Sequence, residues 1–175
     1  MENLIAQSKT ITEAYSRRVK AHGNRVGFRH KKDGEWKEVT FTEHFETVKR
    51  LACGLIHSGL KKGDKVNLIA ATSLHWSQFD VAILCAGGIT VPVYPTNTPE
   101  DTKFIINHSE AEILFVDDFV NLQKVASVAK DCPRLKKVIV NFEVKTGSVK
   151  APFEIIHWNA LYDIGLNQEG SLGTQ

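Results

Sequence analysis

Residues 64–96 read DKVNLIAATSLHWSQFDVAILCAGGITVPVYPT, and this stretch decides the fold. It opens on the apolar run Val66 to Ala70, continues with apolar residues at helical spacing, and ends on a second apolar run, Ile89 to Tyr94. Ser73 is suited to cap the intervening helix, and Gly87-Gly88 is typical of a helix C-cap. A strand, a helix and a second strand predict a right-handed crossover between parallel strands.

The alternation of strands and helices continues on both sides of this stretch. Upstream, the pattern predicts a helix that is capped by Thr40 or Thr42 and stopped by Gly59. Downstream, we expect helices over 98–109 and 119–130 and strands over 112–116 and 137–140. The sequence therefore predicts an α/β fold in which helices cover both faces of a parallel sheet. Pro92 fits an edge strand or a strand end.

The two ends of the chain follow different patterns. A helix from Thr12 to Lys20 should precede two strands, Arg25 to His30 and Trp36 to Phe41, and Asp33-Gly34 is typical of the turn in a β-hairpin. Towards the other end, 141–151 is predicted as a loop and 157–164 as a short helix. The predicted organisation has three parts: an N-terminal helix and hairpin (1–42), an α/β subdomain (43–165) and a polar tail (166–175).

Composition excludes several classes of protein. The net charge of +2 is too small to imply a nucleic-acid partner, for which a clustered basic face is expected. The longest apolar stretch, Val81 to Val93, is shorter than the roughly 20 residues of a membrane-spanning helix, and residues 1–10 lack the apolar core of a secretion signal. Three scattered cysteines (Cys53, Cys85 and Cys132) predict reduced, buried thiols and a cytoplasmic protein.

The patterns that bring catalytic groups together are missing from the chain. It contains no glycine-rich phosphate loop, no G-x-S-x-G nucleophile motif and no metal-ligand spacing among its seven histidines. Asp117-Asp118 could bind a metal or a ribose hydroxyl, although a helix cap is favoured. Trp76 could face a pocket, although its helical register favours the core. We therefore assign no catalytic, cofactor-binding or metal-binding residue.

Two pairs of neighbouring lysines are candidates for contacts with phosphate. Lys61-Lys62 and Lys136-Lys137 could meet phosphates, but solvated turn residues are the favoured interpretation.

Several motifs together resemble the N-terminal region of adenylate-forming (AMP-binding) enzymes, most closely bacterial long-chain fatty acyl-CoA synthetases. The match covers roughly residues 10 to 140. Its motifs are Thr10-Ile11-Thr12-Glu13-Ala14-Tyr15, Arg25-Val26-Gly27-Phe28-Arg29, Val39-Thr40-Phe41-Thr42-Glu43, Gly54-Leu55, Gly59-Leu60, Lys62-Gly63-Asp64-Lys65-Val66, Trp76, Ala86-Gly87-Gly88, Val91-Pro92-Val93-Tyr94-Pro95-Thr96 and Ile105-Ile106-Asn107-His108-Ser109-Glu110-Ala111.

The resemblance implies a two-step ligase of lipid metabolism. Such an enzyme joins a fatty acid to AMP, using ATP and Mg²⁺, and then transfers the acyl group to coenzyme A. The family's phosphate loop, adenine segment, hinge aspartate and catalytic lysine lie beyond the matched motifs. We therefore expect this chain to be the partial N-terminal subdomain of the parent enzyme, inactive alone and without tight cofactor binding.

Several alternatives for identity and association stay open. The chain could be a non-catalytic α/β module that binds a nucleotide or a protein, or the N-terminal part of another adenylate-forming enzyme, such as an amino-acid adenylation domain or a luciferase-like oxidase. Peripheral membrane association is also open. Exposed apolar surface would favour a homo-oligomer.

Overall fold

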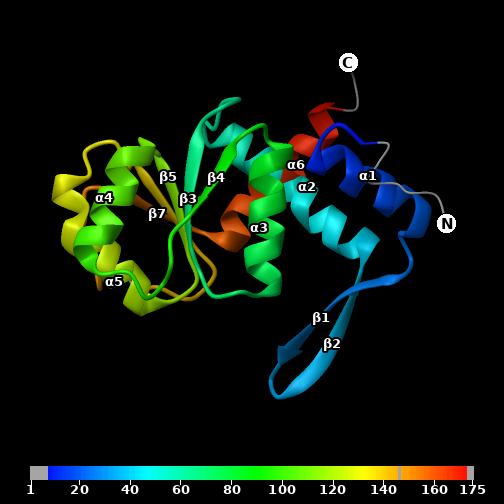
Figure 1. Ribbon diagram of the computed structural model, residues 1–175, viewed down its shortest axis with the longest axis horizontal. Helices are drawn as coiled ribbons and strands as arrows, with labels where there is room; N and C mark the ends of the chain where they lie inside the picture. Colours follow the sequence, from blue (N-terminus) through cyan, green and yellow to red (C-terminus); the bar gives the residue numbers. More distant parts are fainter. Residues whose placement is uncertain (1–7, 146, 173–175) are drawn as a thin grey trace.

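The centre of the molecule is a five-stranded parallel sheet (Figure 1). The computed structural model describes residues 8–145 and 147–172, with the backbone alone over 168–172. The strand order is β4-β3-β5-β6-β7. The strands are β3 (Lys65–Ile69), β4 (Ile89–Pro92), β5 (Ile113–Val116), β6 (Lys137–Val140) and β7 (Glu154–His157). The predicted parallel sheet is confirmed, and Pro92 is the last residue of an edge strand.

Alternating side chains along the strands divide the core into two layers. On β5, Ile113 and Phe115 belong to one buried cluster, and Leu114 and Val116 belong to the other. The first cluster includes side chains from α2 (Phe41–His57), α3 (Leu74–Cys85) and α6 (Trp158–Leu172). The second includes side chains from α4 (Pro99–Ser109) and α5 (Phe119–Val128), which a 3₁₀ turn, Ala129–Asp131, extends. Helices therefore cover both faces, as the sequence predicts.

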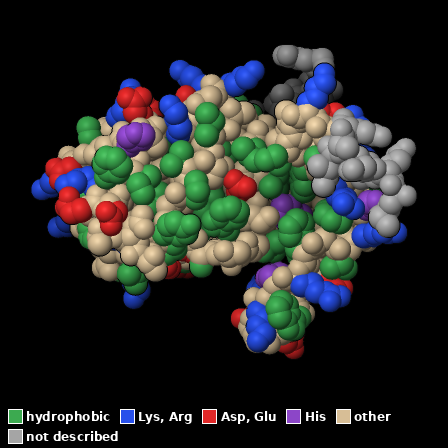
Figure 2. Space-filling model, viewed as in Figure 1, with side chains coloured by type: hydrophobic (Ala, Val, Ile, Leu, Met, Phe, Trp, Pro, Cys, Tyr) green, Lys and Arg blue, Asp and Glu red, His purple; other side chains and the backbone are tan. Residues whose placement is uncertain are grey.

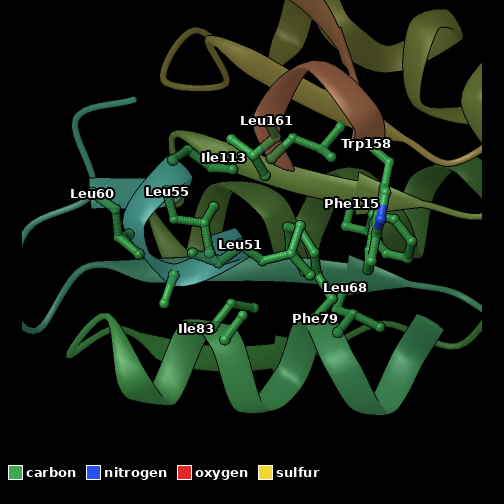
Figure 3. Packing of buried hydrophobic residues seen from close by; sticks show 14 of the residues in the cluster. Leu51, Leu55, Leu60, Leu68, Phe79, Ile83, Ile113, Phe115, Trp158 and Leu161 are labelled. Carbon is green, nitrogen blue, oxygen red and sulfur yellow. The ribbon is translucent and has the colours of Figure 1, made fainter. Parts of the chain in front are cut away.

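We name the first layer the aromatic face, because three rings meet in it. The rings of Phe79 and Phe115 stack with their centroids 4.5 Å apart. The Trp158 ring lies 5.8 Å from Phe79 and 5.7 Å from Phe115 (Figure 3). These residues come from α3, β5 and α6, so this face joins segments that are distant in the sequence.

Helices α2 and α6 pack backbone to backbone at two glycines. A Cβ atom on Gly54 would overlap the Leu161 carbonyl oxygen, and one on Gly165 would overlap the Arg50 carbonyl oxygen. At the same seam the Arg50 guanidinium donates to the Tyr162 hydroxyl. Glycine is therefore required here for close approach of the two helices.

We name the second layer the aliphatic face. Its fully buried side chains include Leu114, Leu122 and Val125, and all its buried members lie between residues 69 and 140. Helix α4 begins with a capping box: Thr98 Oγ1 accepts from the Asp101 N–H at 3.1 Å, and the Asp101 carboxylate accepts from the Thr98 N–H at 3.3 Å. This confirms the predicted start of the helix.

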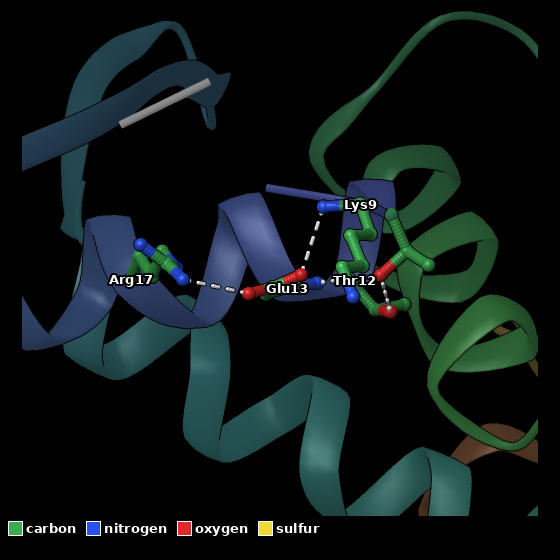
Figure 4. Close-up of polar contacts among 5 residues, drawn as sticks. Lys9, Thr12, Glu13 and Arg17 are labelled. Atoms are coloured by element: carbon green, nitrogen blue, oxygen red, sulfur yellow. Dashed lines mark hydrogen bonds and ion pairs between the residues drawn. The ribbon is translucent and has the colours of Figure 1, made fainter. Parts of the chain in front are cut away.

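The N-terminal helix α1 (Ile11–His22) has its cap two residues before the predicted cap, Thr12. Thr10 is the N-cap, and its hydroxyl accepts from the Glu13 N–H at 3.1 Å. The Glu13 carboxylate in turn accepts from the Lys9 N–H and pairs with Arg17, both at 2.8 Å (Figure 4). Thr10 and Glu13 have the Thr-x-x-Glu spacing that is typical of a helix start, whereas the residue three positions after Thr12 is Tyr15.

The hairpin of β1 (Val26–Lys32) and β2 (Glu35–Thr40) stands out from the body of the molecule (Figures 1 and 2). Its turn residues have the positive φ angles of a tight hairpin turn, 53° at Asp33 and 83° at Gly34, which confirms the prediction. Thr40 caps α2 with Glu43 as the reciprocal partner, which settles the choice between Thr40 and Thr42.

The C-terminal part of the chain differs in detail from the predictions. The loop over 141–151 is confirmed, and the helix predicted over 157–164 begins at Trp158 as α6, but the strand β7 between them was not predicted. Helix α6 is longer than predicted and continues to Leu172, with Gly165 packed within it. Residues 173–175 lie outside the described residues.

The cysteines and membrane segments can also be compared with the predictions. All three cysteines are free, but only Cys132 is buried; Cys53 is half-buried and Cys85 is exposed, so the prediction of buried thiols is wrong for Cys85. No helix in the described part of the chain is long and apolar enough to cross a membrane.

Candidate functional site at the carboxyl edge of the sheet

Polar side chains follow β5 and β6 where these neighbouring strands end. Val116 pairs with Val140 in the sheet, so the next residues, Asp117 and Asn141, leave the sheet side by side. The loop after β3 and the first turn of α3 lie at the same edge, because β3 pairs with β5 in parallel. Ligands of open parallel sheets bind at this edge, which makes it the candidate site.

The Asp117 carboxyl connects two strand ends and keeps one oxygen unused. Its Oδ2 accepts from the Ala71 N–H at 2.8 Å. Its Oδ1 is buried and accepts no hydrogen bond from any described residue. Burial of the carboxyl raises the pKa of Asp117, while the hydrogen bond from Ala71 opposes that rise.

Asn141 contributes a second unused acceptor. Its Oδ1 is buried and has no hydrogen-bond partner among the residues that the structure covers. Buried polar atoms are nearly always hydrogen-bonded in folded proteins. Two acceptors on neighbouring strands therefore make this edge suited to a donor, such as a hydroxyl or an amine of a bound molecule.

The adjacent Asp118 has a structural role. Its Oδ1 accepts from the Asn121 N–H at 2.6 Å and caps α5, and its Oδ2 accepts from the Asn121 side-chain amide at 2.8 Å. The predicted cap is thus confirmed for Asp118, whereas Asp117 faces the sheet edge. Within the described residues, no three His, Cys, Asp or Glu side chains are placed to hold a metal ion.

His75 brings an imidazole to this edge from the first turn of α3. Its ring meets the Trp158 ring edge-on, with centroids 5.4 Å apart. Desolvation lowers the pKa of His75, and the positive charges of His30 and Lys32 on the hairpin lower it further, while Asp117 opposes them. A neutral His75 can donate or accept a hydrogen bond at neutral pH.

The other residues that the sequence analysis considered do not contribute side chains to this candidate site. Trp76 is partly buried against the aromatic face, which supports its assignment to the core. Gly87 has a φ of 81° and donates to the Leu84 carbonyl, so the predicted helix C-cap is confirmed. Lys61, Lys136 and Lys137 lie at the opposite, amino edge of the sheet.

One histidine, His44, lies deep in the interior. His44 is completely buried: Tyr15 bonds its Nδ1 at 2.5 Å, Ser77 lies 3.4 Å from its Nε2, and Phe28 stacks on its ring at 3.9 Å. It therefore joins α1, the hairpin and α3 around α2.

The sequence places Asn141 at the carboxyl end of the predicted strand over 137–140, where ligand-binding side chains of parallel sheets gather. It does not single out His75, which counts there only among the histidines without metal-ligand spacing. The signal for His75 is its place in the first turn of the helix that follows a predicted strand. The site is made from contacts between strands, so local motifs do not reveal it.

Comparisons with known proteins agree with this architecture. The family model described as AMP-binding enzyme matches residues 15–159. The chain is 36% identical over 107 residues to the long-chain-fatty-acid–CoA ligase FadD15 of Mycobacterium bovis, covering 61% of this chain and 18% of that protein. It is 29% identical over 130 residues to the long-chain-fatty-acid–CoA ligase ACSBG2 of Xenopus laevis, covering 74% and 18%. The chain thus spans about a fifth of the length of these relatives.

Solved structures share the fold at low sequence identity. The A-PCP didomain of carboxylic acid reductase from Segniliparus rugosus, in complex with AMP, superposes with a TM-score of 0.77 at 16% identity, over 93% of this chain and 27% of that one. The anthranilate CoA ligase AuaEII, in complex with anthranoyl-AMP, gives a TM-score of 0.76 at 18% identity, over 93% and 30%.

Proposed function

Because the chain belongs to the AMP-binding enzyme family, we propose that it is the N-terminal part of a long-chain fatty acid–CoA ligase. The parent enzyme would form an acyl adenylate from a fatty acid and ATP with Mg²⁺, and then a thioester with coenzyme A. The observation that carries this proposal is the family match over residues 15–159, and the relatives' names favour long-chain substrates. We expect a cytoplasmic enzyme.

Within that enzyme, this chain would provide part of the scaffold. The sequence has no glycine-rich phosphate loop. The described side chains at the carboxyl edge offer no set of three metal ligands, so we assign neither nucleotide nor Mg²⁺ contacts to this chain. Asp117, Asn141 and His75 would instead hydrogen-bond the polar parts of a ligand or of the adjoining protein.

A graft tests the proposal directly. Residues 15–159 replace the corresponding segment of FadD15, and long-chain acyl-CoA formation is measured beside that of the same ligase with the segment deleted. We expect the graft to retain activity with long-chain fatty acids and the deletion to have none. A folded graft that forms no acyl adenylate with any carboxylic acid would overturn the proposal.

The isolated chain is tested in parallel by trapping acyl adenylate with hydroxylamine. We expect no hydroxamate above the level without protein. Hydroxamate formation by the purified chain would show that the chemistry lies within these residues and would contradict the proposed scaffold role.

A further inference from the structure

The amino edge of the sheet, opposite the candidate site, is hollowed. The hollow has a volume of about 490 Å³ and is formed by the turns that precede β3, β5 and β6. Its volume is in the range of small-molecule sites in proteins. The lysine pairs 61-62 and 136-137 were separate in the sequence, but Lys61, Lys136 and Lys137 meet here.

Positive charge exceeds negative charge around the hollow. It is lined by five cations and three carboxylates, a net charge of +2: Lys61, Lys65, Arg134, Lys136, Lys137, Asp64, Glu110 and Glu112. Each carboxylate already has a partner. Glu110 pairs with Arg134 and Glu112 with Lys136, both at 2.8 Å, and Asp64 Oδ2 accepts from the Lys61 N–H at 2.9 Å.

After the two ion pairs, the charges of three lysines remain against the single charge of Asp64. Lys61 and Lys65 are exposed, and neither pairs with a carboxylate in the part of the chain that the structure describes. Lys137 is half-buried and donates from Nζ to the Ser58 carbonyl oxygen at 2.5 Å, which leaves its charge without a counterion among the same residues. An anion in the hollow would neutralise charge that the protein itself leaves unbalanced.

The turns that carry these lysines are fixed by backbone hydrogen bonds. The N–H groups of Lys136 and Lys137 both donate to the Glu112 carbonyl, at 2.9 and 3.0 Å. Gly63, with a φ of 87°, donates to the Gly87 carbonyl at 2.8 Å. Leu60 and Ile113 form a buried apolar floor. Backbone hydrogen bonds thus hold in place the turns that carry the ammonium groups.

We propose that this hollow binds a phosphate-bearing anion, at a site separate from the carboxyl edge. Lysine ammonium groups are point charges that suit the oxygens of phosphate, and several of them together favour a ligand with more than one negative charge. The volume exceeds that of a single phosphate and admits a diphosphate group or a phosphorylated headgroup.

The first experiment titrates inorganic pyrophosphate into the full chain at a fixed ionic strength of about 0.1 M, while backbone amide NMR shifts are recorded. We expect saturable shifts confined to residues 58–65, 110–113 and 134–137. The double variant Lys61→Gln/Lys65→Gln should weaken binding about tenfold or more, because it removes two charges from the hollow.

A matched control separates the site from general charge effects. The double variant Lys20→Gln/Lys150→Gln loses the same charge from two exposed positions outside the hollow, and its affinity for pyrophosphate should change less than about twofold. All four lysines are exposed, so we expect both variants to fold, and thermal unfolding checks this. Shifts that do not saturate, or equal weakening by the two variants, would overturn the proposal.

The source of the phosphate is distinguished with vesicles. Co-sedimentation compares phosphatidylcholine vesicles with vesicles containing about a quarter phosphatidylglycerol. Binding to the anionic vesicles that depends on Lys61 and Lys65, and that pyrophosphate competes away, supports a lipid headgroup. Saturable pyrophosphate binding without vesicle binding supports a soluble phosphorylated ligand. Absence of both contradicts the anion site.

Discussion

The aromatic and aliphatic faces of the sheet are built from the same strands but in different ways. The buried members of the aliphatic face all lie between residues 69 and 140, so neighbouring segments complete it. The aromatic face runs from Val48 to Leu161 and is closed by α6, whose Trp158 completes the three rings. We infer that the aliphatic face forms through contacts between segments that are close in the sequence, whereas the aromatic face needs the distant helix α6.

The largest expected effect is the loss of the central ring. Phe115→Ala should lower the free energy of unfolding by about 4 kcal/mol, because it removes a fully buried ring that contacts Phe79 and Trp158. Leu122→Ala, fully buried on the aliphatic face, should lower it by about 3 kcal/mol. Urea unfolding measures both, and equal losses would show that ring contacts add nothing to the aromatic face.

The next effect tests the closure by α6. Gly165→Ala should lower the free energy of unfolding by about 3 kcal/mol although alanine favours helices, because its Cβ overlaps the Arg50 carbonyl and separates α6 from α2. Asn167→Ala, exposed on the same helix, is the control and should be neutral or slightly stabilising. Thermal unfolding with unchanged stability in Gly165→Ala would refute the close seam.

Acid should weaken the packing of α1, the hairpin and α3 around His44 before it affects the aliphatic face. Burial lowers the pKa of His44 to about 4, from about 6.5 in the unfolded chain. Its contribution to stability is therefore complete above about pH 6.5 and is lost as the pH falls towards 4. Between about pH 7 and pH 5 we expect a loss of about 2 kcal/mol that is absent in His44→Gln.

The matched variant for this measurement is His108→Gln. His108 is exposed on α4, so its replacement is the control for changing a histidine to glutamine outside the packed region around His44. Hydrogen exchange at about pH 5 should show α1 and α2 losing protection while α4 and α5 keep it. The same pH dependence in His44→Gln as in the original chain would assign the acid sensitivity to other groups.

The smallest expected effect is the loss of a helix cap, which we compare between α4 on the aliphatic face and α3 on the aromatic face. Thr98→Ala removes the capping box of α4 and should lower the free energy of unfolding by about 1 kcal/mol. Ser73→Ala removes the cap of α3, whose hydroxyl accepts from the Trp76 N–H at 3.1 Å. We expect a smaller loss there, since long-range packing also holds α3; calorimetry that ranks the two in reverse would count against this contrast.

Local signals predicted most of the fold. Thr98 with Pro99, Asp33-Gly34 and Gly87 each specify a backbone conformation through their own chemistry, and the structure confirms all three. Strand β7 and the length of α6 were missed because each depends on a packing partner: β7 pairs with β6, and α6 packs against the distant α2. Gly165 resembles a helix stop until α2 is placed against it.

The candidate site was less predictable for the same reason. Asp117 was recognised as a carboxylate at a strand end, but its hydrogen bond to Ala71 spans two strands that a crossover separates. The unpartnered oxygen of Asn141 becomes visible only when β6 is paired with β5. Both depend on sheet order, which the sequence pattern left open.

The late position of α6 also has a consequence for biosynthesis. Because chains are made from the N-terminus, the aliphatic face can assemble on the ribosome while Phe79 and Phe115 still await Trp158. During that interval the nascent chain presents an aromatic surface that chaperones recognise. Nascent chains arrested before β7 should bind such a chaperone, and those arrested well after α6 should release it; equal binding at both lengths would contradict this order of assembly.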